Sequence, residues 1–114
     1  MLLDIEYSML MERIEKRFGR PVWNCHAGSD RVRKIGIVTG GAGGDLGLVK
    51  ADGVDTFLTG EGPHHTFSLA EELGVNLIYA GHYATETAGV KALAERVSCE
   101  FGLPWVFLDH PSGL

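Results

Sequence analysis

Apolar residues recur along the chain at two kinds of spacing, and together these predict a layered α/β domain. A stripe at helical spacing over residues 3–18 predicts an amphipathic helix that ends at Gly19. Continuous apolar runs at 34–39, 54–59 and 75–80 predict buried strands, with shorter candidates at 22–25 and 105–108. Helices are predicted between them at 45–51, capped by Asp45, at 64–73, and from 81 to Phe101. Strands separated by helices favour parallel pairing, so we expect one domain over residues 1–114 with a mostly parallel sheet.

Three loops that follow predicted strands carry the candidate residues for ligand binding and catalysis. These loops span Gly40–Gly44, Gly60–His65 and Gly81–Glu86. In an open α/β sheet, ligand-binding residues gather at the carboxyl ends of the strands. We therefore expect the three loops to meet at one edge of the sheet and to form one site.

The third loop holds the most informative pair of residues. His82 and Glu86 are four positions apart at the start of a predicted helix, which places them on one face. Glu86 also lies four residues before Val90, within the apolar stripe. An inward carboxylate needs a partner because an unpaired buried charge is costly, and a metal ion is one such partner. The alternative is a first-turn Glu favoured by the helix dipole beside a hydrogen-bonded core histidine.

The other two loops each have two interpretations. The turn Gly40–Gly44 could bind an anion through its backbone N–H groups, or it could only be a tight turn that needs positive φ. His64 and His65 are adjacent, so they diverge on a helix and cannot easily bind one ion. We expect a polar helix start with one of them facing the cleft.

Composition narrows the classes of function. The net charge of -5 argues against a nucleic-acid-binding surface, which needs clustered Lys and Arg. No apolar run approaches the length of a transmembrane helix, and Asp4 and Glu6 interrupt the first apolar residues, unlike a secretory signal. Cys25 and Cys99 match no metal or redox spacing. We expect a soluble cytoplasmic protein with free thiols and no membrane or nucleic-acid partner.

Four motifs in order resemble the NIF-three-like family of dinuclear-metal proteins, which carry the name GTP cyclohydrolase 1 type 2. The motifs are Thr39–Gly43, Gly53–Glu61, Gly81–Glu86 and Phe107–Pro111. The resemblance runs from about Arg13 to the terminus and corresponds to the C-terminal half of that family. It implies that His82 and Glu86 ligate a pair of divalent metal ions. Oxygen and imidazole donors suit Zn, Mn or Fe alike.

The same resemblance implies an incomplete site. The remaining family ligands, a His pair and an Asp, belong to an N-terminal half, and the pair His64–His65 does not correspond to them. Glu61, His65 and Tyr83 are candidates for orienting the ligands or transferring protons. We expect a metal-binding domain of a dinuclear-metal hydrolase that acts on a small molecule. The alternative is a non-catalytic oligomerising or regulatory module.

The resemblance to half of a larger fold also bears on partners. Apolar surface that the other half would cover should be exposed here, with Trp23 and the first helix as parts of it. We therefore expect a homo-oligomer or a complex with a complementary N-terminal half.

Overall fold

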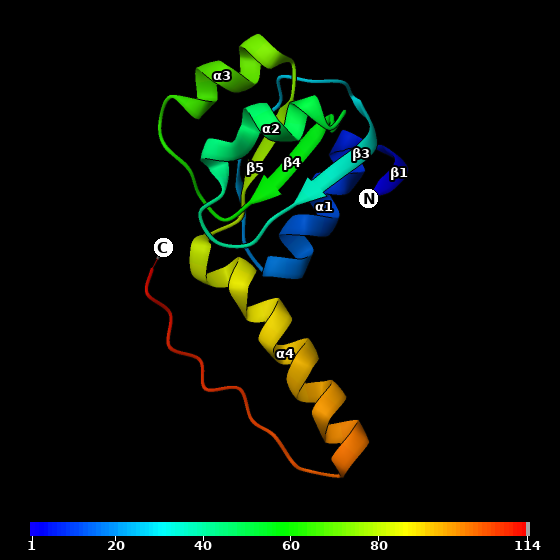
Figure 1. Ribbon diagram of the computed structural model, residues 1–114, viewed down its shortest axis with the longest axis vertical. Helices are drawn as coiled ribbons and strands as arrows, with labels where there is room; N and C mark the ends of the chain where they lie inside the picture. Colours follow the sequence, from blue (N-terminus) through cyan, green and yellow to red (C-terminus); the bar gives the residue numbers. More distant parts are fainter. Residues whose placement is uncertain (114) are drawn as a thin grey trace.

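A twisted five-stranded sheet forms the centre of the structure, a computed structural model that describes residues 1–113. The elements are β1 (Leu2–Glu6), α1 (Tyr7–Phe18), β2 (Trp23–Cys25), β3 (Arg31–Ile37), a 3-10 turn (Gly43–Asp45), α2 (Leu46–Ala51), β4 (Thr56–Thr59), α3 (Thr66–Leu73), β5 (Asn76–Tyr79) and α4 (His82–Phe101). The strand order is β1-β3-β4-β5-β2. Helix α1 covers one face of the sheet, and α2 and α3 cover the other (Figure 1). The predicted α/β class is confirmed.

The sheet is parallel at its centre and antiparallel at both edges. Strands β3, β4 and β5 pair in parallel, because α2 and α3 carry the chain back between them. The edge strands β1 and β2 pair antiparallel with β3 and β5. The predicted parallel pairing is therefore confirmed for the central strands, while the edge strands β1 and β2, which helix α1 connects, run the other way.

The first predicted helix begins later than expected. Residues 2–6 form strand β1, and α1 starts only at Tyr7. In this segment Leu3 and Ile5 are half-buried while Asp4 and Glu6 are exposed, which is the two-residue period of a strand. The two apolar residues also fit a helical stripe, so the short alternation was hidden in the sequence.

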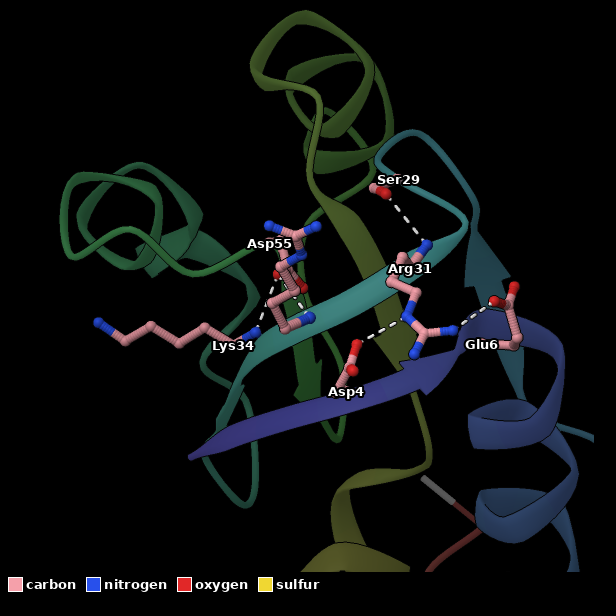
Figure 2. A network of polar contacts seen from close by, with 7 residues as sticks. Asp4, Glu6, Ser29, Arg31, Lys34 and Asp55 are labelled. Atoms are coloured by element: carbon pink, nitrogen blue, oxygen red, sulfur yellow. Dashed lines mark hydrogen bonds and ion pairs between the residues drawn. The ribbon is translucent and has the colours of Figure 1, made fainter.

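An exposed arginine joins β1 to β3 across the sheet edge. The Arg31 guanidinium donates from Nε to Asp4 Oδ1 at 2.6 Å and from Nη1 to Glu6 Oε1 at 2.8 Å (Figure 2). The ion pairs raise the pKa of Arg31 and lower the pKa of the Asp4 carboxyl. On the other side of β3, the Asp55 carboxylate accepts the backbone N–H groups of Arg33 and Lys34. These contacts set the register at the start of the sheet more than they add stability, because exposed pairs contribute little.

Two apolar layers pack against the sheet. One contains Leu10 and Ile14 of α1 against Leu58 and Ile78, and the other contains Leu46 of α2 against Phe57 and Leu77. Adjacent strand residues such as Phe57 and Leu58 serve opposite layers because side chains alternate along a strand. Strands β4 and β5 are buried on both faces, which explains why they appear as continuous apolar runs, whereas β3 alternates between buried residues such as Val32 and Ile35 and exposed ones.

Helix α4 and the chain after it leave the body of the domain. Thr85 is the buried residue of this 20-residue helix, and the segment after Phe101 runs back alongside it (Figure 1). Trp105–Leu108 is not the predicted strand and has no regular secondary structure. A helix of this length carries the chain about 30 Å, and β1 and β2 already occupy both edges of the sheet.

The bounds of other helices and strands differ from the predicted ones by a few residues. Asp45 makes no capping hydrogen bond through its side chain and ends a 3-10 turn instead.

Cys25 and Cys99 are both free thiols, as expected, one buried and one exposed. Within residues 1–113, no helix combines the length and the apolar character that crossing a membrane would require.

Gly60 offers a direct test of how tightly the loops pack. A Cβ at this position would lie 2.7 Å from His82 Cα and 2.8 Å from the Gly81 carbonyl oxygen, and would also meet the Gly40 carbonyl oxygen. Because these neighbours are backbone atoms, we expect Gly60→Ala to lower the free energy of unfolding by at least about 2 kcal/mol. Urea denaturation measures this.

Gly47 supplies the matched control. It lies in α2, and a Cβ there would meet nothing within 4 Å. Gly47→Ala should be neutral or stabilising by up to about 1 kcal/mol, since Ala favours helix. Equal stability of the two variants would contradict the close packing.

Candidate metal centre

Hydrogen bonds to the Gly40 carbonyl oxygen, together with one further backbone bond, connect the three loops. The Gly40 oxygen accepts the N–H of Gly60 at 2.8 Å, the N–H of Glu61 at 3.1 Å and the Thr59 hydroxyl at 3.2 Å. Gly81 N–H in turn donates to the Gly60 oxygen at 2.9 Å. The loops after β3, β4 and β5 therefore meet at the carboxyl edge of the sheet, as predicted.

A second contact ties the first loop to helix α4. Gly40 N–H donates to Thr85 Oγ1 at 3.0 Å, and the Thr85 hydroxyl donates to the His82 carbonyl oxygen. Thr85 is buried and sits between the two predicted ligands along the helix. It fixes the first turn of α4 against the glycine loop.

His82 lies between two carboxylates. Its Nδ1 is 2.6 Å from Glu61 Oε1, and its Nε2 is 3.3 Å from Glu86 Oε1. The predicted pair His82 and Glu86 therefore faces a common region, and Glu61 joins it from the neighbouring loop. The three side chains are 37%, 46% and 56% exposed in the order His82, Glu61, Glu86, so water screens their attraction.

The carboxylates change the protonation of the imidazole. The hydrogen bond to Glu61 raises the pKa of His82 above its usual value, and the charge of Glu86 adds to this, while partial desolvation opposes it. When Nδ1–H is bonded to Glu61, the second proton of the imidazolium lies on Nε2, beside Glu86. A cation at Nε2 would replace that second proton.

The glycine loop forms the wall of this cluster. A Cβ at Gly40 would lie 2.9 Å from Glu86 Oε1 and 3.3 Å from His82 Nε2, so a side chain there would fill the space in front of both atoms. Gly40 also has φ of 74°, which favours glycine. The absence of a side chain keeps the two donor atoms accessible.

The arrangement separates the roles of the two carboxylates. Glu61 is bonded to Nδ1, on the opposite side of the imidazole from Glu86, so the three groups do not converge on one point. Among residues 1–113, no group of three or more His, Cys, Asp or Glu side chains is placed to hold a metal ion. The donor set fits two ligands of an ion, His82 Nε2 and Glu86, with Glu61 orienting the ring.

The glycine loop has little capacity left for an anion. The N–H groups of Gly40, Ala42 and Gly43 donate to Thr85 Oγ1, Thr59 Oγ1 and the Glu61 oxygen. These bonds occupy three of the five backbone N–H groups of Gly40–Gly44. They support the tight-turn interpretation, and anion binding by the loop stays a prediction.

The remaining candidates lie away from the cluster. His65 precedes α3 and is exposed, and its side chain makes no hydrogen bond or ion pair with any other part of residues 1–113. His64 lines a separate cavity beside Trp23 and Phe67. The Tyr83 hydroxyl donates to Asp109 Oδ1 at 2.8 Å and accepts the N–H of His110. Tyr83 thus anchors the C-terminal segment to α4 rather than contacting His82.

Comparison with known proteins identifies the family. The family model of Duf34/NIF3 (NGG1p interacting factor 3) matches residues 3–112. The chain belongs to the Duf34/NIF3 family. The expected resemblance to NIF-three-like proteins is confirmed.

Individual Duf34/NIF3 relatives support this assignment. A Deinococcus radiodurans protein called GTP cyclohydrolase 1 type 2 homolog is 45% identical over 103 residues, covering 90% of this chain and 39% of that protein. A Pyrococcus horikoshii protein of the same name is 44% identical over 112 residues, covering 98% of this chain and 43% of its own length. The crystal structure of a Thermus thermophilus protein matches with a TM-score of 0.86 and 42% identity, over 98% of this chain and 45% of that one. The chain therefore spans about two fifths of the length of these relatives.

The proton shared by His82 and Glu61 can be tested by titration. We expect an NMR titration of the His82 ring to give a pKa above about 6.5, and Glu61→Gln to lower it because the amide removes the charged acceptor. Glu86→Gln should lower it less, since its oxygen is farther from the ring. Glu72→Gln removes the same charge from the exposed side of α3 and should leave the pKa unchanged. Equal effects of Glu61→Gln and Glu72→Gln would contradict the hydrogen bond.

Proposed function

We propose that this chain binds a divalent metal ion through His82 and Glu86, as part of a metal-dependent hydrolase that acts on a small molecule. The observation that carries the proposal is the pair of donor atoms, His82 Nε2 and Glu86 Oε1, 3.3 Å apart beside a wall of glycine. Imidazole and carboxylate are donors that Zn, Mn and Fe accept.

Glu61 supports the ligand histidine in this proposal. A carboxylate on Nδ1 fixes the ring orientation and leaves Nε2 to the metal, as metal-binding histidines commonly require. Thr85 and Gly40 hold the helix turn that carries both ligands. When bound, divalent ions activate water and polarise the bond under attack. The residues of this chain position the ligands, and none of them is assigned to attack a substrate.

The donor count limits what this chain does alone. Catalytic zinc usually has three protein ligands and an open position, and His82 and Glu86 provide two. The family resemblance implies that a His pair and an Asp complete the centre from an N-terminal half. The name GTP cyclohydrolase 1 type 2 homolog, carried by the relatives, suggests GTP as the first substrate to test. The expected cytoplasmic location stays a prediction.

Metal titration tests the proposed ligands. We expect the chain to bind Mn, Zn or Fe weakly, because two ligands form half a site, and His82→Ala or Glu86→Ala to weaken binding by at least about tenfold. Isothermal titration with each metal alone measures this. Adding a complementary N-terminal half should tighten binding, and GTP turnover by the chain alone should be negligible.

Two variants control for the loss of charge or imidazole. Glu100→Ala removes a carboxylate from the same helix, and His65→Ala removes an exposed histidine. Both should bind metal like the unaltered chain. Equal affinity in all five proteins would remove His82 and Glu86 from the site, and GTP turnover that survives a chelator would overturn the proposal.

The exposed face of α4 supports a second candidate function, a module for assembly. Val90, Leu93, Val97 and Phe101 are exposed along this helix, and they follow a helical spacing of three and four residues. Isolated helices are marginal in water, so such a face favours a partner. Trp23 is also exposed, as expected, but the apolar stripe of α1 is not, since Tyr7, Leu10 and Ile14 are buried against the sheet.

We propose that the apolar face of α4 packs against a partner, a second copy or a complementary half. Sedimentation velocity should show association at tens of micromolar, and Val97→Glu should weaken it by at least about tenfold because a buried charge is costly. Ala92→Glu adds the same charge to the opposite side of the helix and should have little effect. A well-packed monomer at all concentrations, also with the N-terminal half present, would contradict assembly through this face.

A further inference from the structure

A cavity of about 430 Å³ lies between the end of α1, the first turns of α4 and the C-terminal segment. Among residues 1–113, its lining includes three cationic side chains, Arg17, Arg20 and Lys91, and one carboxylate, Asp109. The chain as a whole carries a net charge of -5, so this concentration of positive charge runs against its composition. None of His82, Glu61 and Glu86 lines this cavity.

The three cations are available to a ligand. No carboxylate of residues 1–113 lies within ion-pairing distance of any of them. Asp109 accepts a hydrogen bond from the Tyr83 hydroxyl and is thereby held on the tail side of the cavity. The Lys91 ammonium lies 4.1 Å from the centroid of the Phe107 ring, a contact that attracts a cation without neutralising it. Unbalanced positive charge around a cavity attracts an anion.

Backbone geometry holds Arg20 in this position. Its Nη2 donates to the Ala80 carbonyl oxygen at 2.9 Å, at the end of β5. A Cβ at Gly81 would collide with the same guanidinium group, and Gly81 has φ of 98°. The glycine that opens α4 therefore also lets Arg20 cross to the cavity. The other N–H groups of the guanidinium remain for a ligand.

Helix α4 contributes both to the cavity and to the cluster of His82, Glu61 and Glu86. Tyr83 and Thr87 line the cavity, and each directly follows one of the proposed ligands, His82 and Glu86. On a helix, residues i and i+1 lie on neighbouring faces about 100° apart. A ligand held in the cavity thus lies on the helix face next to the one that carries His82 and Glu86.

We propose that this cavity binds the phosphate group of an organic phosphate. Guanidinium forks match the tetrahedral oxygens of phosphate, and a dianion balances more of the three positive charges than a carboxylate does. The identification of this ligand as the substrate of the metal site rests on the proposed function. The phosphate anchors the molecule, and its uncharged end is directed towards His82 and Glu86.

Binding of phenyl phosphate, orthophosphate and benzoate to protein stripped of metal tests the proposal. We expect NMR titration at low salt to shift the amides of Thr87 and Lys91 with phenyl phosphate at millimolar affinity or better, with orthophosphate similar and benzoate much weaker. The double variant Arg17→Gln/Lys91→Gln should weaken phenyl phosphate binding at least about tenfold, as expected for lost charge-assisted bonds. Circular dichroism checks that it folds.

The matched control is Lys16→Gln/Arg96→Gln, which removes two positive charges from the same two helices outside the cavity. It should change the affinity less than twofold. Equal weakening by both double variants, orthophosphate binding without phenyl phosphate, or benzoate binding as tight as phenyl phosphate would each overturn the proposal.

His82→Ala separates this test from that of the metal centre. It should weaken metal binding by at least about tenfold while leaving phenyl phosphate binding within about twofold. Failure of phosphate binding with metal binding intact overturns the cavity assignment alone.

Discussion

The site depends on the carbonyl oxygen of Gly40. This single acceptor takes donors from Thr59, Gly60 and Glu61, and the N–H of the same residue binds Thr85 on α4. The chain after β3, the end of β4 and the start of α4 are thereby joined at one residue, and Gly81 N–H extends the network to the end of β5 by donating to the Gly60 oxygen. Each bond contributes about 1 kcal/mol at most, but together they remove the conformational freedom of loops that would otherwise move independently. His82, Glu61 and Glu86 meet because the backbone beneath them is already assembled.

Such close assembly requires residues without side chains. Gly43 and Gly62 pack against one another and against the Tyr79 hydroxyl, which also contacts Thr66. Gly60 packs against the backbone of the other two loops. The many glycines of the loops thus serve packing first, and only Gly40 and Gly81 combine it with a positive φ next to the cluster. The loop Gly40–Gly44, which resembles a phosphate-binding turn in sequence, connects the neighbouring loop and helix α4 through hydrogen bonds of Gly40.

The sequence was most informative where a residue pattern reports a local property. Continuous apolar runs predicted β4 and β5, since their burial on both faces leaves little polar character, and the apolar residues around Ile35 predicted β3 although its residues alternate in burial. The meeting of three loops followed from the topology of parallel strands. The pair His82 and Glu86 followed from helical spacing, and the family resemblance added its proposed chemistry.

Properties set by distant partners could not be predicted in the same way. Strand β1 exists because Leu2–Glu6 lies beside β3 and Arg31 bonds to Asp4 and Glu6. The failure of Trp105–Leu108 to form a strand follows from where α4 ends and from sheet edges that are already occupied. Glu61 was a candidate from sequence, but its contact with Nδ1 of His82 depends on the hydrogen bonds of Gly40.

Helix α4 is the element through which the separate features of this domain act on one another. Its first turn carries the proposed ligands, the adjacent stripe at Tyr83, Thr87 and Lys91 lines the cationic cavity, and its outer end exposes the apolar face. The first turn is held by the bond between Thr85 and Gly40 in the loop after β3. A partner that covers the apolar face would therefore hold the rest of the helix, and with it Lys91, against the body of the domain. The proposed assembly and the proposed ligand binding would be coupled in this arrangement, because both would depend on the orientation of one helix.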